Sequence, residues 1–369
     1  MDAVQRSIDA PAEAEGGMPA WAVRWMLPVP WLLIVAAVLL EWLTPAAYSY
    51  LTLIAAATPL AALVHRPSVT VLAALTSVAT MVGLELWLGD GFSRHFAVDL
   101  ATTVVLAATA VTFAFTRDRA RRLLHRVRAV GEAAQLALLR PLPDRLGPVR
   151  LAGFYRAADA EALVGGDLYA AVGTPWGIRV VVGDVRGKGN GAVVTVATVL
   201  STFREAAQVQ PTLSGIAARI DRALALDQSD LGDGELFATA VLLEFPLDRQ
   251  AVRVLNRGHV PPLLLDGSGV HTLEAPFALP LGLAELAPEA EAECAHPLTD
   301  RQVLLAFTDG VTEARGRDGT FYPLSERLAA HEFAGPAAAV SFVRRDVARW
   351  TTCTRDDMVV LGLQRTRGA

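Results

Sequence analysis

Four apolar stretches, each about as long as a membrane span, follow one another in the first third of the chain. Crossing the hydrocarbon core of a bilayer takes about 20 helical residues. One such stretch could be the core helix of a soluble protein, but four in succession favour a membrane region. The stretches are Met26–Leu43, Ala46–Val64, Ser68–Leu88 and Phe96–Phe115. The sequence therefore predicts four transmembrane helices over residues 26–115, after a disordered tail at residues 1–25.

The short breaks between the stretches predict two helical hairpins, and the arginines predict their orientation. Basic residues are enriched on the cytoplasmic side of a membrane. Nine arginines in the flanking and connecting segments lie on one side, and only Arg94 lies on the other. Residues 1–20 are too polar for a cleavable signal peptide. We therefore expect a multi-pass protein of the cell membrane, with both termini and the C-terminal part in the cytoplasm.

Composition and charge agree with a membrane portion and give no sign of a nucleic-acid partner. Apolar residues make up 53% of the chain and charged residues 19%, and the formal net charge is only -5. The carboxylates of Glu41, Glu85 and Asp99 lie in or near the stretches, where such groups can mark an ion path. All three are close to the ends, where water or headgroups can solvate them, so a transport role is the weaker interpretation.

A connector is expected over residues 116–146. Its first half is rich in arginine, and its second half is rich in alanine and leucine. Five residues repeat at the spacing of a coiled-coil seam, namely Leu123, Val127, Val130, Ala134 and Ala137. Two interpretations stay open: a helix whose arginines contact headgroups, or a helix that pairs with a second copy in a homodimer. Pro141 and Pro143 should end the helix.

The remaining residues, 147–369, have the pattern of a globular α+β domain. Short β-branched or apolar segments outnumber the helical ones and come in runs, which favours a largely antiparallel sheet. The expected strands are Val149–Tyr155, Ile178–Val182, Leu236–Leu243, Val252–Leu255, Leu263–Leu265, Val303–Phe307 and Met358–Leu363. The expected helices are Ala192–Ala207, Leu213–Ala225, Leu324–Glu332 and Ala337–Trp350.

Acidic residues stand where several of these strands begin or end. Asp167 is expected just after a strand, Asp184 and Asp309 follow apolar runs, and Asp356 and Asp357 precede the last strand. Each alone could be a turn or a helix cap. If the strands are neighbours, however, the carboxylates meet, and like charges repel unless a cation lies among them. All-oxygen ligation suits Mg²⁺ or Mn²⁺ rather than zinc.

Seven motifs in order resemble those of the PPM-type metal-dependent protein serine/threonine phosphatases, in their SpoIIE-like bacterial branch. The resemblance extends over residues 132–366, and residues 133–141 match the segment that leads into the domain in that branch. The motifs are Val164–Tyr169, Gly183–Gly189, Phe237–Ala240, Asn256–Pro261, Pro280–Gly282, Thr308–Ala314 and Arg355–Met358.

The resemblance implies an α-β-β-α sandwich over residues 147–369, with two divalent metal ions, Mn²⁺ or Mg²⁺, at one end. By motif position, Asp184 would bridge both metals and the carbonyl of Val185 would hold one of them. Asp309 and Asp356 would ligate the other metal, and Asp167 would help through the metal shell. Asp184, Asp309 and Asp356 are thus the expected catalytic residues, and Asp357 ranks below Asp356.

The implied reaction is hydrolysis of phosphoserine or phosphothreonine on a cytosolic regulatory protein. Members of the branch commonly act on small anti-anti-sigma regulators of the STAS type, so that is the expected partner. Two metals would clamp the phosphoryl oxygens and acidify a water molecule. Arg186 and Lys188 are candidates for contacting phosphate, or else solvated loop charges. His259 is a candidate proton donor, or else a histidine that fixes its loop.

The sequence departs from the family motifs at two positions, and two alternative functions are considered. Arg257 occupies a position that is usually small, and Val359 replaces the usual threonine or serine. A diguanylate cyclase shares Gly165-Gly166-Asp167, but it explains none of the later motifs. A non-catalytic membrane scaffold of the same fold is the second alternative, and the presence of all the expected carboxylates argues against it.

Overall fold

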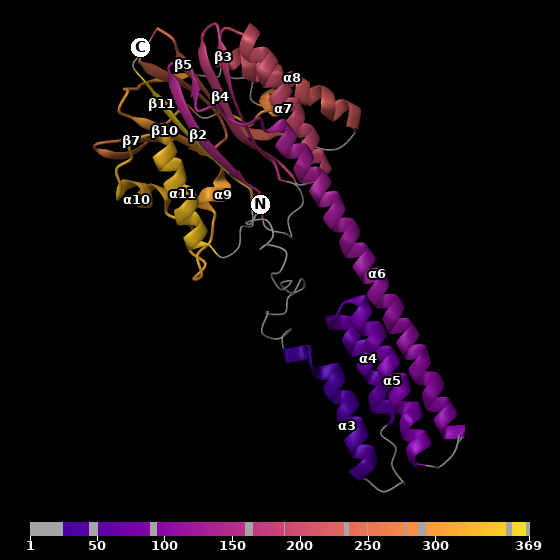
Figure 1. Cartoon of the computed structure of the whole chain (residues 1–369). Coiled ribbons are helices and arrows are strands. Elements are labelled where there is room, and N and C mark those ends of the chain that lie inside the picture. The colour runs from indigo at the N-terminus through magenta and orange to yellow at the C-terminus, as the bar shows by residue number, and fades with distance from the viewer. Residues whose placement is uncertain are drawn as a thin grey trace. The chain divides into compact units, whose positions relative to one another are not determined.

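The computed structural model divides the chain into two compact units, Met1–Arg126 and Val127–Ala369 (Figure 1). Each unit is described by itself. The described residues are 25–43, 51–88, 94–158, 165–187, 189–231, 236–248, 250–276, 278–286, 293–351 and 356–366. The predicted tail falls almost entirely outside these ranges. Two of the three predicted breaks between spans also lie outside them, and so does Lys188.

The N-terminal unit is made of helices. They are α3 (Val29–Leu43), α4 (Leu51–Val64), α5 (Pro67–Leu88) and the first part of α6 (Arg94–Leu138). The first three pack on one another, and Ile34, Ile54 and Met81 from them share a core with Phe96 of α6. Two helical segments, Pro67–Trp87 and Arg94–Leu124, are long and apolar enough to cross a membrane, and the two preceding helices are apolar but shorter.

The break between α4 and α5 lies where the sequence predicts it. Helix α4 ends at Val64, and α5 begins with Pro67, which suits a first helical position because it has no amide hydrogen to leave unpaired. Arg117 from α6 closes the end of α4. Its guanidinium donates to the carbonyl oxygens of Ala62, Leu63 and His65 at 2.6, 2.7 and 2.7 Å. Arg117 therefore bonds to the end of α4, in addition to being one of the nine arginines that predict the orientation.

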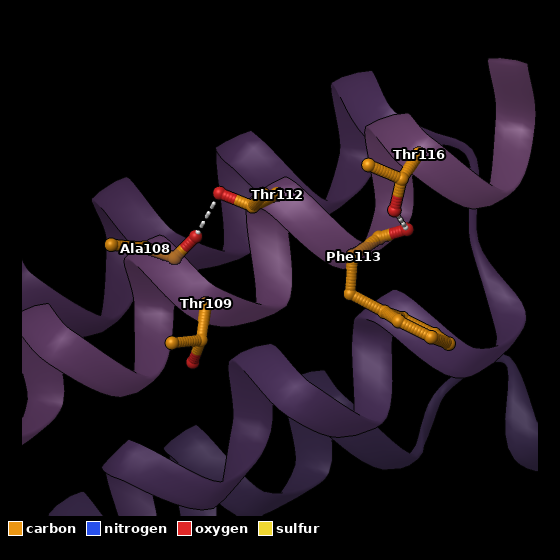
Figure 2. A pocket seen from close by; sticks show the side chains of 5 residues that line it. All are labelled: Ala108, Thr109, Thr112, Phe113 and Thr116. Atoms are coloured by element: carbon orange, nitrogen blue, oxygen red, sulfur yellow. Dashed lines mark hydrogen bonds between the residues drawn. The ribbon is translucent and has the colours of Figure 1, made fainter.

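Threonines on an exposed face of α6 donate their hydroxyls to backbone carbonyls of the same helix. Thr112 donates to the carbonyl of Ala108 at 2.8 Å, and Thr116 donates to that of Phe113 at 3.0 Å (Figure 2). Thr109 bonds in the same way to the turn before it, and a shallow pocket lies over these residues. The hydroxyl donors of these threonines are thus used within the helix, and the face presents methyl groups and an aromatic ring.

Helix α6 runs without interruption from Arg94 to Leu138, so the predicted last span and the predicted connector form one helix. No proline occurs within it, and it ends shortly before Pro141 and Pro143, as expected. Leu139, just beyond the helix, is buried in the core of the C-terminal unit. The side chains of three seam residues (Val127, Val130 and Ala134) lie outside the described ones, so the coiled-coil pairing stays a prediction.

The C-terminal unit contains two antiparallel sheets, which confirms the α+β class. One sheet has the order β3 (Asp167–Thr174), β4 (Gly177–Val185), β5 (Ala238–Pro246), β6 (Ala251–Arg257) and β9 (Cys294–Pro297). The other has the order β1 (Arg145–Leu146), β2 (Val149–Arg156), β11 (Met358–Arg365), β10 (Val303–Phe307), β7 (Leu263–Asp266) and β8 (Gly269–Thr272).

Helices cover the outer face of each sheet, as Figure 1 shows. Helices α7 (Asn190–Val209) and α8 (Leu213–Leu231) share a core with the sheet that contains β4. Helices α10 (Leu324–Ala329) and α11 (Pro336–Trp350) share a core with the sheet that contains β11. A third core, which includes Val180, Val241, Leu304 and Leu361, lies between the sheets. The layers are therefore helix, sheet, sheet and helix.

All seven expected strands are present, together with four that the sequence pattern does not predict. The additional strands are β1, β3, β8 and β9. Asp167 is expected after a strand, but it is the first residue of β3, so that placement is wrong. Alanine and glycine give β3 a weak strand pattern. Its eight-residue register with β4, from Asp167↔Asp184 to Thr174↔Gly177, supplies the missing stabilisation.

A buried ion pair fixes helix α7 to its sheet. Arg179 of β4 and Glu244 of β5 are 0% and 1% exposed, and their nearest nitrogen and oxygen are 2.6 Å apart. The Arg179 guanidinium also donates to the carbonyls of Ala207 and Gln210, at the end of α7. One side chain thus caps the helix and crosslinks two strands, and a buried arginine needs such partners.

Replacing Arg179 with alanine should lower the free energy of unfolding by at least about 3 kcal/mol, since removing one member of a buried pair leaves the other charge poorly compensated. Arg253 also contacts Glu244, which limits the loss. Urea unfolding of the full chain measures it. The matched control is Arg219→Ala, which removes an exposed pair with Glu205 and should cost about 1 kcal/mol or less. Similar losses for both variants would contradict the assigned role.

Candidate metal centre

Two of the predicted carboxylates are brought together by strands β3 and β4. Asp167 and Asp184 are direct partners in the antiparallel register. Gly166 makes this approach possible, because a Cβ there would lie 2.6 Å from Asp184 Oδ1 and would overlap the carbonyl oxygen of Val185. The Val185 amide donates to the Gly166 carbonyl at 3.1 Å. A glycine directly before Asp167 is therefore required for close packing against the Asp184 turn.

The other two carboxylates lie at the ends of β10 and β11, which are antiparallel neighbours in the second sheet. Phe307 pairs with Val360 in their register. Asp309 begins the short helix α9 (Asp309–Thr312) two residues after β10 ends, and Asp356 stands two residues before β11 begins. Burial raises the pKa of Asp309, and the nearby charges of Glu313 and Asp356 raise it further. The strand ends thus bring these two acids together.

A hydroxyl joins the two pairs of carboxylates across the sheets. Thr308, between β10 and α9, donates to Asp167 Oδ2 at 2.6 Å and accepts the amide of Val359 at 2.9 Å. Asp167 is only 3% exposed. Burial raises its pKa well above the ordinary value, and the charges of Asp184, Asp357 and Asp309 add to this effect. Asp167 therefore lies close enough to the other acids for their charges to raise its pKa at this end of the sandwich.

His259 links the two sheets beside the carboxylates. Its Nε2 lies 3.1 Å from the carbonyl oxygen of Phe307, and its Nδ1 lies 3.0 Å from the hydroxyl of Thr239. Because a carbonyl only accepts, Nε2 carries the proton and Nδ1 accepts from Thr239. Burial lowers the pKa of the ring to about 4. The ring is thus neutral at pH 7 with both nitrogens occupied, which favours a structural histidine over a proton donor.

The two departures from the family pattern have structural explanations. Arg257 is buried and turns to α8, where it forms an ion pair with Asp221 at 3.0 Å. Asp221 also accepts the amide of Gly282 at 2.6 Å, so the pair joins β6, α8 and the turn at residues 280–282. Val359 packs its side chain in the core between the sheets, and only its backbone bonds to Thr308. Neither departure removes a carboxylate.

The remaining candidates lie on the turn after β4. Val185 ends the strand, and Arg186 is exposed, with its guanidinium carbon 5.2 Å from the centre of the Phe237 ring. Lys188 lies outside the described residues.

Three residues beside the acids, Thr308, Tyr155 and Gln135, have roles that no sequence pattern indicates. Thr308 belongs to one of the seven motifs, but nothing in that motif predicts its bond to Asp167. Tyr155 donates its hydroxyl to Asp357 at 2.8 Å from the end of β2. Gln135, in the last turn of α6, reaches the same carboxylate. Contacts between positions so distant in the chain leave no local signal.

The chemical type of these acidic side chains suits a hard divalent cation. Across the parts of the chain that the structure describes, no group of three or more histidine, cysteine or acidic side chains converges closely enough to hold a metal ion as it stands. The gathered donors are nonetheless all oxygen, and burial together with neighbouring acids raises the pKa values of Asp167 and Asp309. Oxygen donors of this kind suit Mg²⁺ or Mn²⁺.

In metal-free protein the Asp167 carboxyl should become destabilising as pH rises, and Asp167→Asn should remove that contribution. A carboxyl whose folded pKa is raised above 3.8 keeps its proton in the native state while the unfolded chain releases it. Its contribution is therefore complete below about pH 4 and disappears as pH rises through the folded pKa. A tenfold difference in proton affinity between the two states corresponds to about 1.4 kcal/mol. Urea unfolding in chelator from pH 4 to 8 measures the difference between the two proteins.

Asparagine keeps an oxygen to accept the Thr308 hydroxyl, so the variant should be the more stable one at neutral pH. Parallel pH profiles for the two proteins would contradict the assigned burial of a charge.

Comparison with known proteins identifies relatives of the C-terminal unit. The sequence model of the family described as Stage II sporulation protein E (SpoIIE) matches residues 174–366. The structure resembles the SiaA-PP2C domain of Pseudomonas aeruginosa, with a TM-score of 0.56 and 18% identity over 68% of this chain and 99% of that one. These residues thus have the fold of a PP2C-type phosphatase.

Two further solved structures are similar. The PP2C phosphatase domain and a regulatory fragment of SpoIIE from Bacillus subtilis match with a TM-score of 0.51 and 18% identity, over 58% of this chain and 63% of that one. The RsbU and RsbW domains of a Mycobacterium tuberculosis protein match with a TM-score of 0.48 and 22% identity, over 60% and 61%. The chain therefore spans less than two thirds of these two relatives. No curated protein matches it by sequence.

Proposed function

The chain belongs to the SpoIIE family, and on that premise we propose that it is a membrane-anchored protein phosphatase dependent on Mn²⁺ or Mg²⁺. It would hydrolyse phosphoserine or phosphothreonine on a cytosolic regulatory protein. The observation that carries the proposal is the gathering of Asp167, Asp184, Asp309 and Asp356 at the ends of paired strands, where burial and mutual charge raise the pKa of two of them.

The proposed metal ligands come from both sheets. Asp184 and the carbonyl of Val185 lie at the end of β4, and Asp309 and Asp356 lie at the facing ends of β10 and β11. Asp167 supports them from β3. When bound, the metals supply positive charge for the phosphoryl oxygens and a water molecule of lowered pKa.

The residues around the ligands hold them at a fixed spacing. Thr308 ties β10 to Asp167, and His259 ties β10 to β5 through Thr239. Positioning of this kind supplies most of the rate in phosphoryl transfer, since little covalent chemistry is required of the protein. Arg186 is exposed on the turn after Asp184, so we assign it to contact with the substrate phosphate, together with Lys188.

The proposed substrate is a small phosphorylated regulator of the STAS type. Support for this choice comes only from the family, whose SpoIIE-like branch commonly acts on anti-anti-sigma factors. The proposed membrane anchor rests on the apolar segments Pro67–Trp87 and Arg94–Leu124. It is also supported by the threonines of α6 whose hydroxyls bond to carbonyls of the same helix. A multi-pass topology, cytoplasmic termini and a homodimer through α6 remain part of the proposal.

The purified chain in detergent should hydrolyse a phosphoserine peptide in the presence of Mn²⁺ and not in chelator. Asp184→Asn should lower kcat/KM by more than about 100-fold, because loss of a ligand exceeds the roughly 10- to 100-fold effects typical of residues behind the ligands. Asp266→Asn is the control, since Asp266 is the last residue of β7 and accepts the amide of Ser268, outside the proposed site. An inactive wild-type protein of normal stability would favour the scaffold alternative.

The identity of the substrate can be tested in cells. Phosphoproteomes of strains with the wild-type gene and with Asp184→Asn should differ in few sites, and a STAS-type protein should gain phosphoserine or phosphothreonine in the variant. Comparison with the Asp184→Asn strain keeps the protein level constant. A rise in unrelated phosphoproteins with no change in any STAS domain would contradict the proposed substrate.

A further inference from the structure

Asp357 is buried beside the proposed metal ligands, and protein donors occupy its carboxylate. The side chain is 3% exposed. Its Oδ2 accepts the Tyr155 hydroxyl at 2.8 Å, and its Oδ1 accepts the amide of Ala158 at 2.9 Å. Gln135 Nε2 also lies 3.5 Å from Oδ2. Three elements, α6, β2 and the loop after β2, thus hold one carboxylate.

The same residue packs against the backbone next to three proposed ligands. A Cβ on Gly165, two residues before Asp167, would overlap the carboxylate of Asp357. A Cβ on Gly310, beside Asp309, would overlap the Asp357 carbonyl oxygen. The amide of Asp357 donates to Asp356 Oδ1 at 3.0 Å. Asp357 therefore contacts the backbone near Asp167 and Asp309 and bonds to the side chain of Asp356.

Gln135 brings helix α6 into this arrangement. It is 1% exposed, and its Nε2 also donates to the carbonyl of Asp167 at 3.3 Å. The end of α6 is itself fixed, because Arg204 of α7 donates to the carbonyl of Leu138 at 2.8 Å and Leu139 is buried in the core. The amide of Gln135 therefore connects the helix end to both Asp167 and Asp357.

We propose that Asp357 and Gln135 are positioning residues of the metal centre, so that the last turn of α6 is part of the site. Asp357 orients the ligands by joining their backbones and does not itself ligate a metal. The inference rests on the proposed function. Residues behind the ligands typically change metal affinity by roughly 10- to 100-fold. The bonds from Tyr155 and Ala158 are short and charge-assisted, whereas that from Gln135 is longer, so Gln135 should have the smaller effect.

Calorimetric titration of the metal-free full chain with Mn²⁺ tests the proposal, because it reports affinity and the number of ions bound independently of activity. Asp357→Asn should bind as many ions as the wild type, with affinity about 10- to 100-fold weaker. Asp356→Asn should bind one ion fewer. Gln135→Leu should weaken affinity by up to about 10-fold. Urea unfolding of each variant accompanies the titration, and Tyr155→Phe replaces Asp357→Asn if that variant does not fold.

The matched control is Gln208→Leu. Gln208 also donates its side-chain amide from a helix to a strand carbonyl, that of Gly173, at the opposite end of β3 from Asp167. It should leave Mn²⁺ affinity unchanged.

Three outcomes would overturn the inference. Loss of one ion in Asp357→Asn would make Asp357 a ligand. Wild-type affinity in Asp357→Asn and Gln135→Leu, with only lower stability, would make both merely structural. A wild-type chain that binds no Mn²⁺ would overturn the proposed function, and this inference with it, whereas normal wild-type binding with unaffected variants rejects the inference alone.

Discussion

The C-terminal unit depends on holding several carboxylates of like charge close together in a partly buried place. Such groups repel and lose hydration, which is why the pKa values of Asp167 and Asp309 are raised. The neutral Thr308 hydroxyl donates to Asp167, and the neutral ring of His259 bonds to the Phe307 carbonyl and to Thr239 beside the acids. These neutral bonds link the two sheets beside the acids and bring no positive charge to them.

The stabilising charge pair lies elsewhere on the same strand. Arg179 and Asp184 both belong to β4, five residues or about 16 Å apart along the strand. At Arg179 the buried charge has its partner Glu244 and caps α7, and Asp184 lies at the other end of the strand beside Asp167. A fold can tolerate a destabilised functional end when the rest of the strand is firmly held. The firmly held end of β4 therefore supports the end that carries the candidate site.

Much of the fold is predictable because local patterns determine it. The β-branched run Ile178–Val182 is typical of a buried strand, and it forms the centre of β4. Strand β3 escapes prediction because its alanines and glycine carry little local preference, and its stability comes from pairing with β4. The sequence also does not predict that α6 is continuous. The change from apolar to basic residues at position 117 resembles a boundary between elements, but no residue there interrupts the helix.

The acids of the candidate site can be predicted, and the residues that position them cannot. Aspartates beside glycines at strand ends leave a visible local pattern, whereas the bond from Tyr155 to Asp357 joins residues 202 positions apart and that from Thr308 to Asp167 joins residues 141 apart. Only the register of the sheets brings such groups together. It follows that sequence patterns identify what could bind a metal, while the geometry that decides how tightly it binds belongs to the tertiary fold. For this chain that geometry extends as far as the last turn of α6, since Gln135 contacts both Asp167 and Asp357.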